Sequence, residues 1–138
     1  TLGRAEAELG FQDMPRNPSN NRRVGYTLEQ IQTFRAHFGT LPGRDPATDA
    51  PMVIAIQNFK GRVGKSTTCV NFAHYLGLKG YRVLVVDADS QATTTSMFGY
   101  VPDADIEADQ TVLPYLIGEQ SNLAYAIRPT YLPNVSLI

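Results

Sequence analysis

The sequence predicts an α/β fold that opens as a doubly wound, mostly parallel sheet. Two short apolar runs rich in β-branched residues, Val53–Ile56 and Tyr81–Val86, have the pattern of parallel strands covered on both faces. A glycine-rich loop and then a helical pattern lie between them, and Gly80 is placed to cap the end of that helix. Strand, helix and strand in this order predict a βαβ unit with a right-handed crossover.

The helix of this unit is expected to start after Gly64. Val70, Ala73 and Leu76 recur along it with a period of about 3.6 residues, which is typical of a face packed against a sheet. The single cysteine, Cys69, lies in the same helix and has no Cys or His neighbour at metal-ligand spacing. We therefore expect Cys69 to be a small buried residue rather than a disulfide partner or a zinc ligand.

Weaker patterns follow the second predicted strand. After Asp89 comes a polar stretch of Ser and Thr with no predicted element. A helix is then expected around Val112–Ile117, and strand-like pieces near Leu123–Ile127 and Val135–Ile138. These segments would belong to one α/β domain, present in part, over residues 52–138.

Two stretches rich in chain breakers precede this region. Residues 1–25 are expected to form an extension or linker, because the part from 10 to 25 is rich in Pro, Asn and Arg. Residues 41–51, which contain two prolines around Gly43, predict a second linker. We therefore place a domain boundary within 41–51.

Residues 26–40 predict one amphipathic helix between these stretches. Thr27 is a good N-cap, Gln30 can complete a capping box, and Gly39 ends the run. The apolar positions recur at helical spacing: Leu28, Ile31, Phe34 and Phe38.

Composition and charge exclude several classes of protein. With 43% hydrophobic and 18% charged residues, the chain is typical of a soluble globular protein, and it shows neither a signal peptide nor an apolar run of membrane-spanning length. The net charge of −1 excludes a basic footprint over the whole chain. The stretch from residue 14 to 44 is locally basic, with arginines that could approach DNA: Arg16, Arg22, Arg23, Arg35 and Arg44. We expect a cytoplasmic protein that does not bind membranes.

The loop between the predicted strands has the residues that bind phosphate. It consists of Lys60, Gly61, Arg62, Val63, Gly64, Lys65, Ser66 and Thr67. A phosphate group needs backbone N–H donors, the positive end of a helix dipole and a mobile cation, and this loop with its helix supplies all three. Lys65 would reach the β- and γ-phosphates of ATP, and Ser66 would ligate Mg²⁺. The alternative is a glycine-rich turn that only joins strand to helix.

The loop departs from the usual phosphate-binding pattern, because Phe59 stands where that pattern has its first glycine. It resembles instead the ParA/MinD family of deviant Walker A ATPases, whose loop reads KGGVGK followed by Ser or Thr. The resemblance implies a P-loop NTPase fold. It gives Lys60 the role of the signature lysine that reaches the γ-phosphate of a partner subunit. A homodimer held by ATP and released by hydrolysis would follow.

Two aspartates come directly after the second predicted strand. Ligands of open α/β sheets lie at the carboxyl ends of strands, so Asp87 and Asp89 would lie beside the phosphate loop. The segment from Asp87 to Gln91 resembles the family's DxDPQ motif. By that resemblance Asp89 positions the attacking water and joins Lys60 and Lys65 as a catalytic residue. Asp87 and Asp89 would support a Mg²⁺ site together with Ser66. The alternative is that both aspartates only cap the following turn and helix.

Arg62 is the main departure from the family, which has glycine at this position. Glycine in such a loop usually serves a backbone angle that a Cβ opposes, or a surface that must be approached closely. Arginine would then cost on the order of a few kcal/mol in strain, and it would weaken nucleotide-dependent dimerisation. The opposite expectation is that its guanidinium adds a phosphate contact.

The segment from Arg22 to Ile31 resembles a second known element. It is similar to the MerR-like or winged helix-turn-helix region that precedes the ATPase in the large plasmid-borne ParA and RepA proteins. Residues 26–40 would be the remnant of that DNA-binding region. The resemblance implies operator binding as well as nonspecific DNA binding, whereas the alternative is a solvated amphipathic helix.

Together these features predict a partition protein that binds and hydrolyses ATP with Mg²⁺ and segregates a plasmid or chromosome. The resemblance implies a ParB-type centromere-binding partner and association with the bacterial nucleoid. The family's second aspartate, base pocket and basic C-terminal surface have no counterpart before Ile138, so the chain is expected to be an N-terminal fragment. The alternatives are a noncatalytic DNA-binding regulator, a truncated inactive remnant or a MinD-like positioning ATPase.

Overall fold

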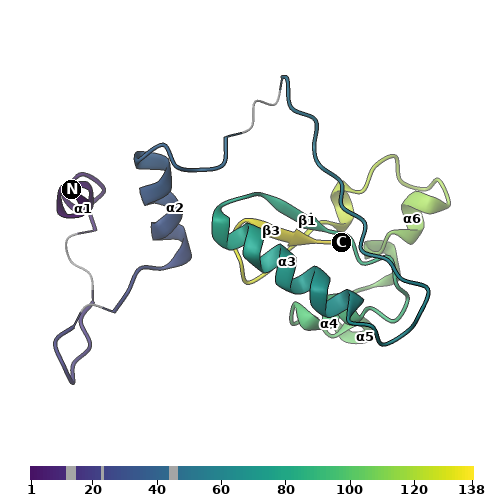
Figure 1. Cartoon of the computed structure of the whole chain (residues 1–138). Helices are drawn as coiled ribbons and strands as arrows, with labels where there is room; N and C mark the ends of the chain where they lie inside the picture. Colours follow the sequence, from purple (N-terminus) through teal and green to yellow (C-terminus); the bar gives the residue numbers. More distant parts are fainter. Residues whose placement is uncertain (12–14, 23, 44–46) are drawn as a thin grey trace. The chain divides into compact units, whose positions relative to one another are not determined.

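The computed structural model of the chain describes residues 1–11, 15–22, 24–43 and 47–138. They fall into two compact units, Thr1–Gly43 and Arg44–Ile138. Figure 1 shows two helices in the first unit and a small sheet with helices in the second. Arg23 and Arg44, two of the arginines expected to approach DNA, lie outside the described residues, as do 12–14 and 45–46 of the predicted linkers.

The first unit contains α1 (Leu2–Glu8) and α2 (Leu28–His37). The predicted helix is confirmed by α2, including its capping box: Gln30 N donates to Thr27 Oγ1 at 3.3 Å, and Thr27 N donates to Gln30 Oε1 at 2.9 Å. Helix α1 corrects the expectation of an extension or linker over residues 1–25, because residues Leu2–Glu8 of that stretch are helical. Its Ala and Glu residues favour a helix, and Ala5 is buried.

Phe34 of α2 is the centre of a small core in this unit. It is 7% exposed, and the rings of Phe11 and Tyr26 meet it edge to face at centroid distances of 5.3 and 5.0 Å. The hydroxyl of Tyr26 donates to the carboxylate of Glu6 in α1, which is also buried. These contacts hold α1 and the segment before α2 against one aromatic ring.

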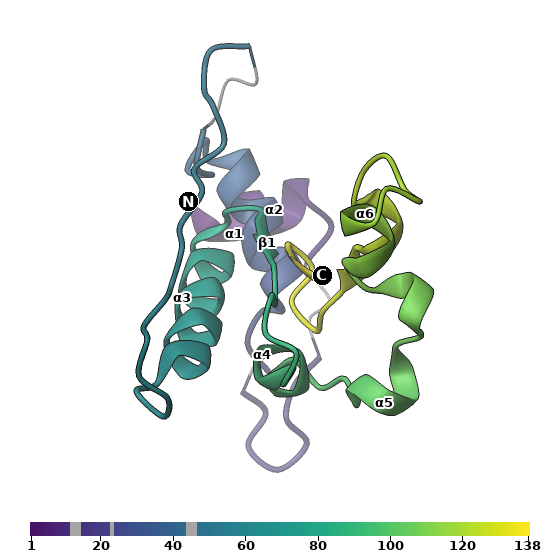
Figure 2. The ribbon, with the colours of Figure 1, turned by 90° about the vertical axis from the view of Figure 1, so that its right-hand side faces the viewer.

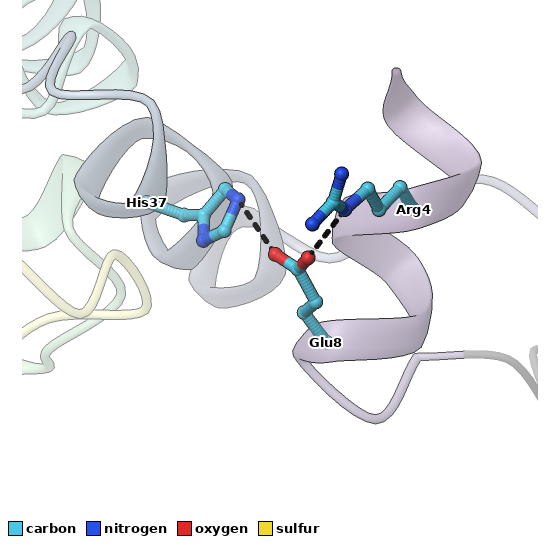
Figure 3. Close-up of polar contacts among 3 residues, drawn as sticks. All are labelled: Arg4, Glu8 and His37. Atoms are coloured by element: carbon cyan, nitrogen blue, oxygen red, sulfur yellow. Dashed lines mark hydrogen bonds and ion pairs between the residues drawn. The ribbon is translucent and has the colours of Figure 1, made fainter.

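A polar contact also joins the two helices of the first unit (Figure 3). Glu8 accepts from Arg4 Nε at 2.8 Å, and its other oxygen lies 3.4 Å from His37 Nε2. Because the arginine and the carboxylate are well exposed, such a pair contributes only about 0–1 kcal/mol. The aromatic core therefore contributes more to this unit than the ion pair.

The second unit contains one long helix, several short helical pieces and a three-stranded sheet. In chain order these elements are α3 (Lys65–Lys79), β1 (Val83–Val85), α4 (Thr93–Met97), α5 (Pro102–Asp105), η1 (Ala108–Gln110), α6 (Leu113–Leu116), η2 (Ala124–Ala126), β2 (Arg128–Pro129) and β3 (Val135–Leu137). No helix in the described ranges is long and apolar enough to cross a membrane.

The sheet has the order β1-β3-β2 and is mixed. Strand β1 runs parallel to β3, with Val83 opposite Val135 and Val85 opposite Leu137, and β2 runs antiparallel to β3. The α/β class is therefore confirmed, and so are the second predicted strand and the last one. The described sheet is small and mixed rather than mostly parallel.

Helix α3 covers one side of the sheet and forms the core with it, as the two views in Figures 1 and 2 show. It starts after Gly64 and ends at Gly80, both with positive φ (+82° and +94°), as predicted. Val70 and Ala73 are buried on its inner face, and Leu76 is half-buried. The core consists of Val70, Ala73, Val85, Phe98, Val135 and Leu137.

Asn134 fastens the end of α3 to the start of β3. Its Nδ2 donates to the carbonyl of Gly77 at 2.9 Å and to the carbonyl of Tyr81 at 2.5 Å. Gly77 is buried, so the helix backbone itself lies against the strand there. One side chain thus fixes the turn between α3 and β1.

Two predicted strands are wrong in this structure. Val53–Ile56 has no regular secondary structure, and Val53 is 90% exposed. A strand needs a neighbour to bond its backbone, and none of the described strands pairs with this segment. The βαβ unit is consequently present only as its helix and second strand. Leu123–Ile127 contains a 3₁₀ turn, η2, which Asn122 caps by accepting from Ala124 N at 2.9 Å.

Of two short helices that follow β1, one is predicted and one is not. The helix expected around Val112–Ile117 is confirmed as α6, which starts with a proline in its first turn, where the missing N–H is not needed. Helix α4 lies in the polar stretch after Asp89, where no element is predicted. Thr94 and Thr95 of α4 are buried, which composition alone does not indicate.

Candidate functional site

The phosphate-type loop leads directly into the N-terminus of α3. Gly64 is the N-cap, in the left-handed region at φ +82° and ψ +18°, and Thr68 N donates the first helical hydrogen bond to Gly64 O at 2.8 Å. Among the described residues no acceptor bonds the N–H groups of Lys65, Ser66 and Thr67. Free amides at a helix start, together with the positive end of its dipole, are suited to bind an anion.

The two lysines of the loop lie at its two ends. Lys65 Nζ contacts the carbonyl of Lys60 at 3.4 Å, and Lys60 N donates to Asn58 Oδ1 at 2.9 Å. The side chain of Lys65 is therefore folded back over the loop rather than extended into solvent. Lys60 itself is exposed, as is Phe59 beside it.

Arg62 adopts a backbone conformation that favours glycine. Its φ is +57°, and it is exposed. Gly61, by contrast, is not among the residues with positive φ, so the loop places its left-handed turn on the arginine rather than on the neighbouring glycine. For a residue with a Cβ this conformation costs roughly 1–2 kcal/mol. The backbone angle of the kind expected at a glycine position is therefore present at Arg62.

Asp87 lies just beyond the carboxyl end of β1. Its backbone N–H donates to Ile138 O at 2.9 Å, which extends the pairing with β3. Its Oδ2 accepts two hydrogen bonds from Thr95, from the backbone N–H at 2.9 Å and from Oγ1 at 2.8 Å. The aspartate thus caps α4, in agreement with the alternative interpretation of the motif.

Asp89 caps the turn that follows. Its Oδ1 accepts from Gln91 N at 3.0 Å, and its carbonyl accepts from Ala92 N at 2.8 Å. The side chain is exposed. One of its oxygens therefore orders the turn, and the carboxylate remains accessible to solvent.

Cys69 connects the position of Asp87 to α3. Burial against the core raises the pKa of the Cys69 thiol, and the negative charge of Asp87 raises it further. Asp87 is therefore close enough to the second turn of α3 to act on it electrostatically. Ser66 lies three residues before Cys69, on the same face of the helix and one turn closer to the loop. Helix α3 contacts both β1 and α4, and Asp87 follows β1 and accepts from α4, so Asp87 lies where these three elements meet.

The donor set around the loop fits a magnesium nucleotide rather than a metal held by protein alone. In the described part of the chain, no group of three or more His, Cys, Asp and Glu side chains could hold a metal ion. Mg²⁺ in nucleotide sites usually takes one or two protein oxygens and completes its shell with phosphates and water. Ser66 and the two aspartates provide such oxygens, and the free amides of α3 suit the phosphates.

Sequence reasoning missed one member of this cluster, Thr95. It is 5% exposed and supplies both donors to Asp87. A run of three threonines from Thr93 to Thr95 was visible, but their burial was not. His74 has a packing role in α3: its Nε2 lies 2.6 Å from the hydroxyl of Tyr131, and its ring meets Phe98 edge to face.

Comparisons with known proteins show which family the chain resembles. A family profile described as the AAA domain matches residues 51–138. Protein SopA of Escherichia coli K12 is 43% identical over 94% of this chain and 34% of its own length. A putative replication protein A of Rhizobium rhizogenes is 40% identical over 99% of this chain and 36% of its own length. The chromosome-partitioning ATPase Soj of Thermus thermophilus is 46% identical over 48% of this chain and 24% of its own length.

The chain spans about a third of the length of the first two relatives. Their matches cover nearly all of it, so they include residues of the first unit as well as the second. No solved structure matches the chain significantly.

Proposed function

The chain belongs to the AAA-domain family and, within it, to the ParA-type partition ATPases, and we propose that it binds Mg-ATP at residues 60–67. Binding and hydrolysis would drive the segregation of a plasmid or chromosome. In this proposal residues 60–67 are the phosphate loop at which ATP is bound and hydrolysed.

The start of α3 is the observation that supports this proposal most. The N–H groups of Lys65, Ser66 and Thr67 have no acceptor among the described residues, and Lys65 Nζ already lies over the loop. A polyphosphate would satisfy these donors and neutralise the cations at once. Every helix start leaves such amides unpaired, so the two lysines beside them are what distinguishes this loop from an ordinary connecting turn.

The residues of the site take distinct roles in this proposal. Lys65 holds the β- and γ-phosphates, and Lys60, at the exposed entrance of the loop, contacts the nucleotide of a second subunit. When bound, Mg²⁺ neutralises charge that develops on the phosphates. Ser66 and Asp87 would hold it, and Asp89 orients the attacking water.

We assign DNA contact to the first unit. Arg16, Arg22 and Arg35 are described there, and α2 is a capped amphipathic helix. The resemblance of Arg22–Ile31 to the region that precedes the ATPase in the large plasmid-borne ParA and RepA proteins supports operator binding through this unit. A ParB-type partner, a nucleotide-dependent homodimer and association with the nucleoid complete the proposed function.

A second function is favoured by Arg62. Its strained backbone and its bulk would oppose close approach of two subunits, as expected of a noncatalytic DNA-binding regulator or an inactive remnant. In that case the chain binds nucleotide weakly or not at all.

Binding of a fluorescent ATP analogue separates these functions. With Mg²⁺ present the chain should bind the analogue, and Lys65→Ala should weaken binding by about tenfold or more, since one charge-assisted hydrogen bond contributes roughly 1.5–3 kcal/mol. Lys79→Ala, at the other end of α3, is the matched control and should change binding less than about twofold. If the chain and both variants fail to bind the analogue alike, the site is not a nucleotide site.

A further inference from the structure

Thr95 makes two short hydrogen bonds to Asp87, the aspartate proposed as a metal ligand. Asp87 Oδ2 accepts from the N–H of Thr95 at 2.9 Å and from its hydroxyl at 2.8 Å. Thr95 is 5% exposed, so this hydrogen bond is largely shielded from water. A short hydrogen bond from a buried hydroxyl to a carboxylate fixes the direction of that carboxylate.

The contact joins the end of β1 to the start of α4. Helix α4 starts after Ala92, which has φ +48° and offers no side-chain cap. Asp87 lies eight residues before Thr95, on the other side of a turn, and it supplies the missing acceptor at the helix start. The carboxylate therefore cannot rotate without leaving the N–H of Thr95 unpaired in a buried position.

The second oxygen of Asp87 is left available. Among the described residues Oδ1 accepts only a long contact of 3.4 Å from Asp89 N. Asp87 follows β1 and accepts from α4, and α3, whose first turn carries Ser66, contacts both of these elements. One oxygen is thus anchored to α4, and in the described part of the chain the other has only the long contact with Asp89 N.

We propose that Thr95 is a positioning residue for the metal site, acting through Asp87. By holding Oδ2, Thr95 keeps Oδ1 turned toward the Mg²⁺ that accompanies ATP at Ser66. This inference rests on the proposed function. Asp87 would then connect the metal to α4, because a shift of its carboxylate would also move Thr95 in the first turn of that helix. Residues that orient a metal ligand typically change metal affinity about 10–100-fold when they are removed.

The chain offers a matched control in Thr94. This neighbour is 6% exposed and lies in the same helix, but its hydroxyl takes part in no hydrogen bond that the structure describes. Thr95→Val and Thr94→Val both replace a buried hydroxyl by a methyl group. Only the first substitution removes a donor to Asp87.

Titration of the whole chain with Mg²⁺ in the presence of a fluorescent ATP analogue tests the inference. We expect Thr95→Val to raise the Mg²⁺ concentration at half-maximal binding by about tenfold or more, with Mg²⁺-free binding changed less than about twofold. Thr94→Val should leave both values unchanged within about twofold, and Thr95→Ser, which keeps the hydroxyl, should restore the Mg²⁺ dependence. If Thr95→Val weakened binding equally with and without Mg²⁺, or left the Mg²⁺ dependence unchanged, Thr95 would be a structural cap only.

A spectroscopic measurement on the unsubstituted chain covers the case in which Thr95→Val does not fold. In the nucleotide-bound chain, adding Mg²⁺ should shift the amide resonance of Thr95 clearly more than that of Thr94. Equal shifts would overturn the inference. If the analogue bound without any Mg²⁺ dependence, the nucleotide site would stand and the role of Thr95 would be wrong. If the unsubstituted chain bound no analogue at all, the proposed function itself would fail, and this inference with it.

Discussion

A Cβ added at Gly77 would lie 2.8 Å from Cγ2 of Val135, closer than two carbon atoms can pack. Val135 is 1% exposed and central to the core, so it has little room to move. The missing side chain at Gly77 is therefore what lets α3 rest directly on β3.

Gly77→Ala should destabilise the second unit. Overpacking costs about 1–3 kcal/mol, and alanine regains about 0.5–1 kcal/mol in a helix, so the free energy of unfolding should fall by roughly 1 kcal/mol. Chemical denaturation monitored by circular dichroism measures this change. In a Val135→Ala background, where Cγ2 is absent, the same substitution should become neutral or stabilising. A loss of the same size in both backgrounds would show that packing against Val135 is not the cause.

Arg62→Gly should stabilise the chain. It relieves a left-handed conformation worth roughly 1–2 kcal/mol, less the entropy that glycine adds to the unfolded chain. We expect a gain of about 1 kcal/mol in thermal or chemical unfolding. Arg62→Ala is the control, since it removes the charge but keeps the Cβ, and it should give no such gain. An equal gain in both variants would point to repulsion among Lys60, Arg62 and Lys65 instead.

The same variant addresses dimerisation. With ATP and Mg²⁺, Arg62→Gly should form a tighter dimer than the unsubstituted chain, because the loop loses a bulky side chain at the surface that a second subunit must approach. Light scattering over a concentration series gives the two dissociation constants. The idea is wrong if the dimers are equally tight.

Thr27→Ala should loosen the first unit. The substitution removes the hydrogen bond from Gln30 N to Thr27 Oγ1 at the start of α2 and should cost about 1 kcal/mol. The helical signal of residues 1–43 should then melt at a lower temperature. Thr27→Ser keeps the acceptor and should retain the stability of this unit to within a few tenths of a kcal/mol.

The Cys69 thiol should react with iodoacetamide more slowly than free cysteine near neutral pH. Burial and then Asp87 raise its pKa, so fewer thiolates are present at a given pH. Because its pKa is higher in the folded chain, the thiol holds its proton more tightly there than in the unfolded chain, and this stabilises the fold. The stabilisation is complete below the ordinary thiol pKa and is lost as pH rises through the higher folded value.

Asp87→Asn separates the two causes of that shift. Removing the negative charge should lower the pKa of Cys69, so the alkylation rate at a fixed alkaline pH should rise. Asp103→Asn, a substitution at an acid far along the chain, should leave the rate unchanged. Equal rates in all three proteins would mean that Asp87 is not near α3.

Local signals in the sequence predicted the helices best. The capping box of Thr27 and Gln30 and the two glycines that bound α3 specify their helices through backbone conformations that depend on few neighbours. The same kind of apolar pattern predicts strands at Val53–Ile56 and at Val83–Val85. Of these two segments, only Val83–Val85 pairs with a described strand, β3. An apolar run indicates that a segment can form a strand, whereas pairing depends on residues distant in sequence.

In the candidate site, too, local sequence predicts one part, whereas the other depends on the fold. The loop from Lys60 to Thr67 was recognised from residue types at fixed spacing, and its order in the chain places it at the start of α3. The contact of Thr95 with Asp87 depends on a turn through Ala92 in a left-handed conformation, which a residue with a Cβ rarely adopts. No spacing rule would have predicted that turn.

The position of β1 in the sheet has a practical consequence. Within the described ranges β1 is bonded only on the side of β3, and Leu84 is 48% exposed. A strand with one open edge is a template on which another strand can add, and the extended apolar residues around Val53 have the composition to do so. Concentrated samples of this chain should therefore self-associate through backbone pairing, and a lysine in place of Leu84 should keep them in solution.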